Sequence, residues 1–137
     1  MSQTIQEKNK ALVLEAFDTL FNKRDYAAAE RFWSPAYIQH SAHIAPGREG
    51  LFELVKAAPK ELHYENALIV ADGDYVMLHG RFSGDLAASE WVVVDILRID
   101  NGLLAEHWDV ILVGRRRPLG QPSDRRDPVR GQSDPLR

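Results

Sequence analysis

Cysteine is absent from the 137 residues of this chain. Its absence excludes disulfides, thiolate nucleophiles and cysteine-ligated zinc. Long apolar runs are also missing, since none approaches the roughly 18 residues that a membrane-spanning helix needs. The first residues, MSQTIQEKNKA, lack the apolar centre of a secretory signal. We therefore expect a cytoplasmic protein with no membrane partner.

Positive charge is scarce over most of the chain, and the net charge is −3. A nucleic-acid-binding protein normally carries a basic face, so no nucleic-acid partner is expected. Residues 115–137 are the exception, with seven Arg against three Asp, four prolines and no aromatic residue. Such a segment cannot bury enough apolar surface to offset its ordering entropy. We predict one domain over residues 1–113 and a disordered Arg/Pro-rich tail over residues 114–137, with an arm for an acidic partner as the alternative for the tail.

Apolar residues recur at helical spacing in the first part of the chain. They are Leu12, Val13, Ala16, Phe17, Leu20 and Phe21. This pattern predicts a first helix that ends at residues 22–25. A second helix is expected over residues 26–33, broken at Ser34-Pro35, followed by an irregular stretch. A third is expected over residues 47–58, between Pro46 and Pro59.

After Pro59 the hydrophobic period changes from 3.6 to 2, which is typical of strands. Residues 62–71 and 74–84 form one expected hairpin, and residues 88–100 and 103–113 form a second. Helices followed by antiparallel strands predict an α+β fold. We expect a curved, mostly antiparallel sheet with the three N-terminal helices on one face.

The turn of the second hairpin, Asn101-Gly102, permits two registers. A two-residue type I′ turn pairs Asp100 with Leu103. A three-residue loop with a glycine bulge instead pairs Ile99 with Leu103, and sets Asp95 opposite His107. We favour the second register, because it gathers Asp95, His107 and Asp109 on one face, where clustered polar groups can satisfy one another.

The face that carries these three polar residues is expected to meet the helices and line a cavity. The opposite face then carries Arg98 and Glu106, close enough to pair, and an apolar strip. The strip consists of Val92, Val94, Ile96, Trp108 and Val110. A contiguous strip of this size is unfavourable in water. It predicts a homodimer formed sheet to sheet.

Several segments together resemble one family. They are YIQHSAHIAPGREG, ADGDYVMLHG and VVDILRIDNGLLAEHWDVI, preceded by the expected helices. In this combination the chain resembles the SnoaL-like polyketide cyclases of the nuclear transport factor 2-like superfamily, in the subfamily of predicted aldol-condensation catalysts. The resemblance implies a cone-shaped α+β fold, a deep pocket between sheet and helices, a homodimer, and no metal or cofactor.

The resemblance also implies a set of site residues. Asp109 matches the pocket carboxylate that acts as acid and base, with His107 beside it and Asp95 as a second polar position. His40 and His43 match the loop that closes the mouth of the cone. The other expected substrate contacts are Phe17, Trp33, Tyr37, His79 and Trp91.

An apolar pocket suits acid–base chemistry, because burial raises the pKa of a carboxyl group toward the range of a general base. Asp109 is expected to remove a proton next to a carbonyl, while His107 or His40 donates a hydrogen bond to the enolate oxygen. Aldol closure or isomerisation would follow. The alternatives are a non-catalytic ligand-binding dimer, an orienting role for Asp95, and a metal site of His40, His43, His107 and Asp109, which the irregular HSAH spacing disfavours.

Overall fold

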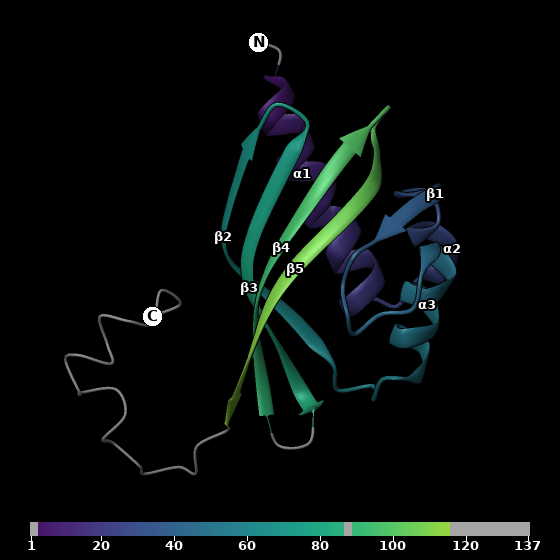
Figure 1. The fold of residues 1–137 in the computed structure, drawn as a ribbon, viewed down its shortest axis with the longest axis vertical. Coiled ribbons are helices and arrows are strands. Elements are labelled where there is room, and N and C mark those ends of the chain that lie inside the picture. Colours follow the sequence, from purple (N-terminus) through teal and green to yellow (C-terminus); the bar gives the residue numbers. More distant parts are fainter. Residues whose placement is uncertain (1–2, 87–88, 116–137) are drawn as a thin grey trace, which may run out of the picture.

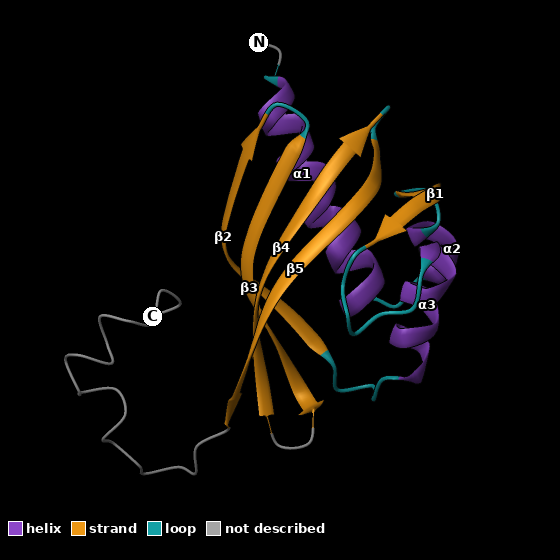
Figure 2. Cartoon of the chain, viewed as in Figure 1, coloured by secondary structure: helices purple, strands orange, loops and turns teal. Residues whose placement is uncertain are grey.

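In a computed structural model, which describes residues 3–86 and 89–115, five strands form one curved sheet (Figures 1 and 2). The helical elements are α1 (Ile5–Phe17), η1 (Asp18–Asn22), α2 (Tyr26–Ala29) and α3 (Gly47–Ala57). The strands are β1 (Trp33–Gln39), β2 (His63–Asp72), β3 (Tyr75–Leu86), β4 (Ser89–Asp100) and β5 (Leu103–Arg115). Their order is β1-β5-β4-β3-β2, with β1 parallel to β5 and the other pairs antiparallel. The expected α+β class is confirmed.

Helix α1 begins at a capping box, in which Thr4 and Glu7 each bond the other's backbone N–H. The helix packs against β2 and β3, behind the sheet in Figure 1. It continues into η1, a π-helical turn that the helical period did not predict. The buried residues of α1 and η1 include Val13, Ala16, Phe17, Leu20 and Phe21. The predicted apolar stripe of the first helix is therefore its core-facing side.

Asn22, at the end of η1, binds the backbone of the edge strand β2. Its Oδ1 accepts from the Tyr64 N–H at 2.8 Å, and its Nδ2 donates to the Tyr64 carbonyl at 3.1 Å. An edge strand has backbone groups without a neighbouring strand. The Asn22 amide supplies both partners at this residue and ties the helical layer to the sheet.

Strand β1 corrects the sequence prediction for this region. Helix α2 ends at Ala29, not at residue 33, and Trp33–Gln39 is an edge strand beside β5. Pro35 is tolerated there because an edge strand needs fewer ladder hydrogen bonds. The pairing is irregular between Trp33 and Ile38. Burial alternates irregularly along this strand and its parallel partner lies far away in sequence, so the local pattern did not predict it.

The turn between β4 and β5 also differs from the favoured register. Asn101 (φ 52°) and Gly102 (φ 74°) both have left-handed backbones, as a two-residue type I′ turn requires, and Asp100 pairs with Leu103. The expected three-residue loop is therefore wrong. A bulge at Ala105 then shifts the register, so Arg98 pairs with Glu106.

The bulge restores the predicted division of the two faces. Asp95 pairs with Asp109 and Leu97 with His107, so all three polar residues lie on the inner face. The prediction that Asp95 sits directly opposite His107 is wrong by two residues. Leu104 also takes the buried position that the favoured register gave to Leu103.

Arg24, which follows η1, links this part of the helical layer to the carboxyl end of α3. Its backbone is left-handed (φ 56°), and its guanidinium donates to the carbonyls of Val55, Ala58 and Pro59 at the end of α3. A cation at the carboxyl end of a helix satisfies free carbonyls and complements the helix dipole.

Within the described ranges, no helix is long and apolar enough to cross a membrane. The predicted boundary at residue 113 stays a prediction, since β5 runs to Arg115 and most of the expected tail lies outside the described residues.

Candidate active site

A pocket of about 140 Å³ lies between the inner face of the sheet and the helices. Its wall is almost wholly apolar and aromatic. The lining residues are Phe17, Phe21, Trp33, Tyr37, His43, Ile44, Leu51, Leu54, Val55, Ala58, Leu62, Phe82, Trp91, Val93, Asp95, Leu97, His107, Asp109 and Ile111. Three ionisable side chains gather on its β4–β5 wall, and an apolar cavity with few converging polar groups is typical of a small-molecule site.

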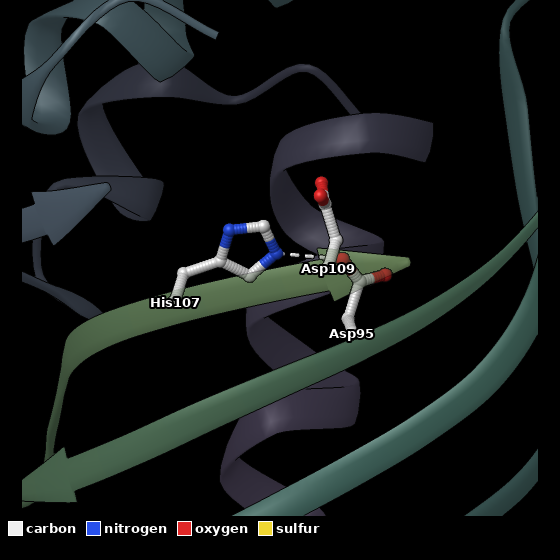
Figure 3. A group of neighbouring side chains, drawn as sticks. All are labelled: Asp95, His107 and Asp109. Atoms are coloured by element: carbon white, nitrogen blue, oxygen red, sulfur yellow. Dashed lines mark hydrogen bonds and ion pairs between the residues drawn. The ribbon is translucent and has the colours of Figure 1, made fainter. Parts of the chain in front are cut away.

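Asp95 on β4 and His107 on β5 form a close buried pair (Figure 3). His107 Nε2 lies 2.6 Å from Asp95 Oδ1, and the two residues are only 5% and 4% exposed. Burial raises the pKa of Asp95, the contact with His107 lowers it, and the charge of Asp109 raises it again. Burial is the largest of these effects, so Asp95 holds its proton more tightly than an exposed aspartic acid.

Gln39 on β1 sets the tautomer of His107. Gln39 Oε1 lies 2.6 Å from His107 Nδ1 and accepts from the backbone N–H of Ser41 at 3.0 Å. A backbone N–H can only donate, so the Gln39 atom that faces both groups must be the oxygen. His107 Nδ1 must then carry a hydrogen, because an amide oxygen only accepts.

One proton is therefore shared between His107 Nε2 and Asp95 Oδ1. With Nδ1–H fixed by Gln39, the pair is either a neutral imidazole beside a carboxylic acid or an imidazolium beside a carboxylate. Both ring nitrogens of His107 are engaged in either form. Asp95 Oδ2 is buried with no hydrogen-bond partner among the described residues. His107 is thus poorly placed to donate to a substrate. This differs from the sequence-based hypothesis, in which His107 or His40 donates to the enolate oxygen.

Asp109 stands beside this pair without a side-chain hydrogen bond to any described residue. It pairs directly with Asp95 across the two strands. Its carboxylate extends away from the strands (Figure 3). Ligand atoms of Asp95, His107 and Asp109 all lie within 4.8 Å of one another. Asp109 is the member of the group that is free to meet a bound molecule.

The same three side chains have the atom types and spacing of a cation site. A cation bound by all three would have to displace the 2.6 Å contact between His107 and Asp95. The arrangement therefore fits a shared proton better than a metal ion. The metal set weighed from the sequence is not brought together, because His40 lies on the other face of the sheet.

Five of the expected substrate contacts line the pocket. They are Phe17, Trp33, Tyr37, His43 and Trp91. His43 is an exposed residue of the loop after β1, and its ring lies 5.8 Å from the ring of Trp91. Leu54, another lining residue, is 44% exposed. The pocket therefore opens to solvent near His43 and Leu54.

The other two expected contacts, His40 and His79, do not line the pocket. His40 follows the inward-facing Gln39 and so points outward, where its Nε2 lies 2.7 Å from Glu106 Oε2 and its ring stacks on Trp108 at 4.9 Å. Glu106 also binds Arg98 Nε at 2.9 Å, which confirms the predicted pairing of those two residues. His79 pairs with Val94 on the outer face, between the inward-facing Leu78 and Gly80.

Gln39 is the site residue that the sequence reasoning missed. It lies two positions after Tyr37, and Gln39 Nε2 donates to the Tyr37 hydroxyl at 3.0 Å. Burial raises the pKa of Tyr37, and the charges of Asp95 and Asp109 add to this effect, so its hydroxyl stays protonated. The alternation of Tyr37 and Gln39 would have marked both as inward-facing, had Trp33–Gln39 been identified as a strand.

Residues 13–107 match the SnoaL-like domain family. No protein of curated function matches the chain.

Solved structures share the fold. A proposed ketosteroid isomerase from Kribbella flavida superimposes with a TM-score of 0.68 at 17% identity, over 91% of this chain and 90% of its own. A proposed polyketide cyclase from Bacillus cereus gives 0.67 at 19% identity, over 81% and 78%. AclR, a proposed hydroxylase from Streptomyces galilaeus, gives 0.63 at 27% identity, over 78% and 90%. Because one fold can host unrelated reactions, these likenesses establish the fold and leave the chemistry to be argued from the site.

Proposed function

The chain belongs to the SnoaL-like domain family, and from its pocket we propose that it is a cofactor-independent enzyme that moves protons on a carbonyl-containing small molecule. The observation that carries this proposal is the position of Asp109. Its carboxylate stands in an apolar pocket, unbound by other side chains of the described residues and beside a pair that shares one proton. A general base needs this freedom to reach a substrate proton.

The proposed reaction begins when Asp109 removes a proton from the carbon next to a carbonyl. The C–H bond breaks, the proton moves to Asp109, and the electron pair forms an enolate. The enolate then takes that proton back at the far carbon of a conjugated C=C bond, which is isomerisation, or its carbon attacks a second carbonyl carbon and the new alkoxide takes the proton from Asp109, which is aldol closure. The likeness to a proposed isomerase and a proposed cyclase supports these two outcomes.

The Asp95–His107 pair is proposed to adjust the charge beside Asp109 during the reaction. Its proton can shift between Oδ1 and Nε2, so the charge next to Asp109 adjusts as Asp109 gains and loses a proton. We therefore propose a positioning and charge-adjusting role for His107 and Asp95. Direct donation from His107 to the enolate would require breaking a 2.6 Å contact.

Hydrogen exchange tests this proposal. The full chain is mixed in D₂O with ketones and lactones that bind it, and NMR follows loss of the protons next to the carbonyl. Exchange that depends on the protein and falls about a hundredfold or more in Asp109→Asn supports the proposal. Binding of these compounds with no exchange of any of them would instead identify a non-catalytic binder, which the almost wholly apolar wall also suits.

We further propose that the chain forms a homodimer through the outer face of the sheet. Val92, Val94, Ile96, Trp108 and Val110 lie together on that face by register. Exposed apolar residues widen the strip, among them Leu112 (66%), Leu68 (56%) and Met77 (45%). A second copy would cover the same strip with an identical one, as two-fold symmetry requires.

A further inference from the structure

We infer that the pocket takes an uncharged molecule of about one ring, held with its carbonyl oxygen toward Tyr37 and an acidic C–H toward Asp109. This inference rests on the proposed function, and it adds the size, the charge and the orientation of the substrate. Each of the three comes from a separate feature of the pocket.

The size follows from the volume. The cavity measures about 140 Å³, close to the roughly 150 Å³ of a dry apolar cavity that binds benzene in another protein. One six-membered ring with a small substituent therefore fills the space. A fused system of several rings would extend past His43 and Leu54 into solvent, where its apolar surface gains nothing from the pocket.

The charge follows from the lining. Among the described residues that line the pocket, Asp95 and Asp109 are acidic, none is Lys or Arg, and the histidines are His107 and the exposed His43. The Asp95–His107 pair is neutral overall in both of its forms, because it holds one shared proton. Asp109 is left as the uncompensated negative charge, and the apolar wall cannot solvate a second one. A carboxylate or phosphate is therefore expected to bind more weakly than a neutral molecule of the same shape.

The orientation follows from Tyr37. Its oxygen accepts from Gln39 Nε2 at 3.0 Å, and its own proton finds no acceptor among the described side chains. Tyr37 is only 5% exposed, and burial raises the pKa of its hydroxyl, which therefore stays protonated and is a ready donor to a carbonyl oxygen. Gln39 bonds both Tyr37 and His107, and ligand atoms of His107 and Asp109 lie within 4.8 Å of each other, so the oxygen-binding and proton-removing groups lie at the same end of the pocket. Charge that develops on the carbonyl oxygen would meet a donor already in position.

Binding of four matched probes to the full chain tests this inference by ligand-observed NMR. The probes are cyclohexanone, methylenecyclohexane, cyclohexanecarboxylate and a fused three-ring ketone. We expect cyclohexanone to bind about tenfold more tightly than the carboxylate. We also expect the three-ring ketone to bind no more tightly than cyclohexanone, although its larger apolar area would raise affinity in a larger pocket.

Two variants separate the effect of the Asp109 charge from the effect of the Tyr37 hydroxyl. Asp109→Asn should reduce the difference between cyclohexanone and the carboxylate, because it removes the repelling charge. Tyr37→Phe should weaken cyclohexanone about fivefold and leave methylenecyclohexane, which has the same shape and no oxygen, unchanged. Circular dichroism confirms that each variant keeps its fold.

The inference is overturned if the carboxylate or the three-ring ketone binds more tightly than cyclohexanone, or if neither one-ring neutral probe binds at millimolar concentration. Failure of the proposed function looks different. In that case cyclohexanone binds as expected, and its protons do not exchange with D₂O. Conversely, protein-dependent exchange of a large or anionic substrate would preserve proton transfer and refute the size or the charge.

Discussion

The side-chain oxygen of Gln39 lies 2.6 Å from Nδ1 of His107 and joins the edge strand β1 to β5 on the pocket side of the sheet. On the opposite side, His40, which follows Gln39, has its Nε2 2.7 Å from Oε2 of Glu106, which precedes His107. The two contacts hold β1 to β5 from both faces. The inner one also decides which nitrogen of His107 carries a fixed hydrogen.

Replacing Gln39 should therefore change the tautomer of His107. In the unaltered chain we expect ¹⁵N NMR to show His107 Nδ1 protonated at neutral pH. Gln39→Met has a similar length and no acceptor oxygen, so this preference should be lost. Gln39→Glu keeps an acceptor and should retain it. An unprotonated Nδ1 in the unaltered chain would contradict the hydrogen-bond assignment.

Asp109 and Asp95 should respond differently to the same substitution. Asp109→Asn removes the proposed base, so proton exchange should fall by about two orders of magnitude or more while neutral ligands still bind. Asp95→Asn should cause a smaller loss of rate and a changed pH profile, because the shared proton is removed. Equal losses in both variants, with unchanged pH profiles, would count against the distinction between base and support.

The raised pKa of Asp95 has a consequence for stability. In the unfolded chain this carboxyl loses its proton near pH 3.9, and in the folded chain it does so at a higher pH. Between these values the folded state binds more protons, so the free energy of unfolding decreases as the pH rises. Asp95→Asn lacks this effect. Its stability relative to the unaltered chain should therefore increase with pH from about 4 upward.

Urea unfolding of both proteins at a series of pH values measures this difference. Curves that stay parallel from acid to neutral pH would show that Asp95 has the same pKa in the folded and unfolded states.

Asn22 should contribute to the stability of the fold beyond its small size. Asn22→Ala leaves the N–H and carbonyl of Tyr64 without their partners, and we expect a loss of about 1–3 kcal/mol in the free energy of unfolding. Asn9→Ala is the matched control, since Asn9 makes one longer hydrogen bond of 3.3 Å to the Gly73 carbonyl. It should cost less. A larger loss in Asn9→Ala would contradict the proposed attachment of η1 to β2.

The proposed dimer is tested by its mass in solution. Light scattering should give about twice 15.5 kDa for the unaltered chain. Val110, 67% exposed, lies near the middle of the strip, so Val110→Glu should give a monomer. Ile5→Glu, at the 55% exposed start of α1, is the control and should leave the dimer intact. A monomeric unaltered chain would exclude the proposal.

The sequence predicted the residues of the inner face better than their exact pairing. Period-2 alternation placed His107 and Asp109 on one face of β5, and the favoured register added Asp95 to that face, where the structure has all three. Which residue lies opposite which depends on turn geometry and on a bulge at Ala105, and both registers of the turn agreed with the composition. The faces were therefore predicted, and the direct pairing of Asp95 with Asp109 was not.

Strand β1 could not be predicted from local pattern, and the errors at the site follow from this. Its parallel partner β5 begins more than sixty residues later, and Ser34-Pro35 is typical of a break. Without that strand, His40 was placed at the pocket and Gln39 was left out. Recognition of the alternation along β1 corrects both, since Tyr37 and Gln39 face inward and His40 outward.

The contact between Gln39 and His107 spans 68 positions of the chain, and this separation has a kinetic meaning. The hairpins β2–β3 and β4–β5 join neighbouring segments and can form early, whereas β1 must close a long loop before it gains any contact. We expect the hairpins to fold first and the Nδ1–H tautomer of His107 to be set only when β1 docks. Mild denaturation should then abolish turnover before the sheet itself melts.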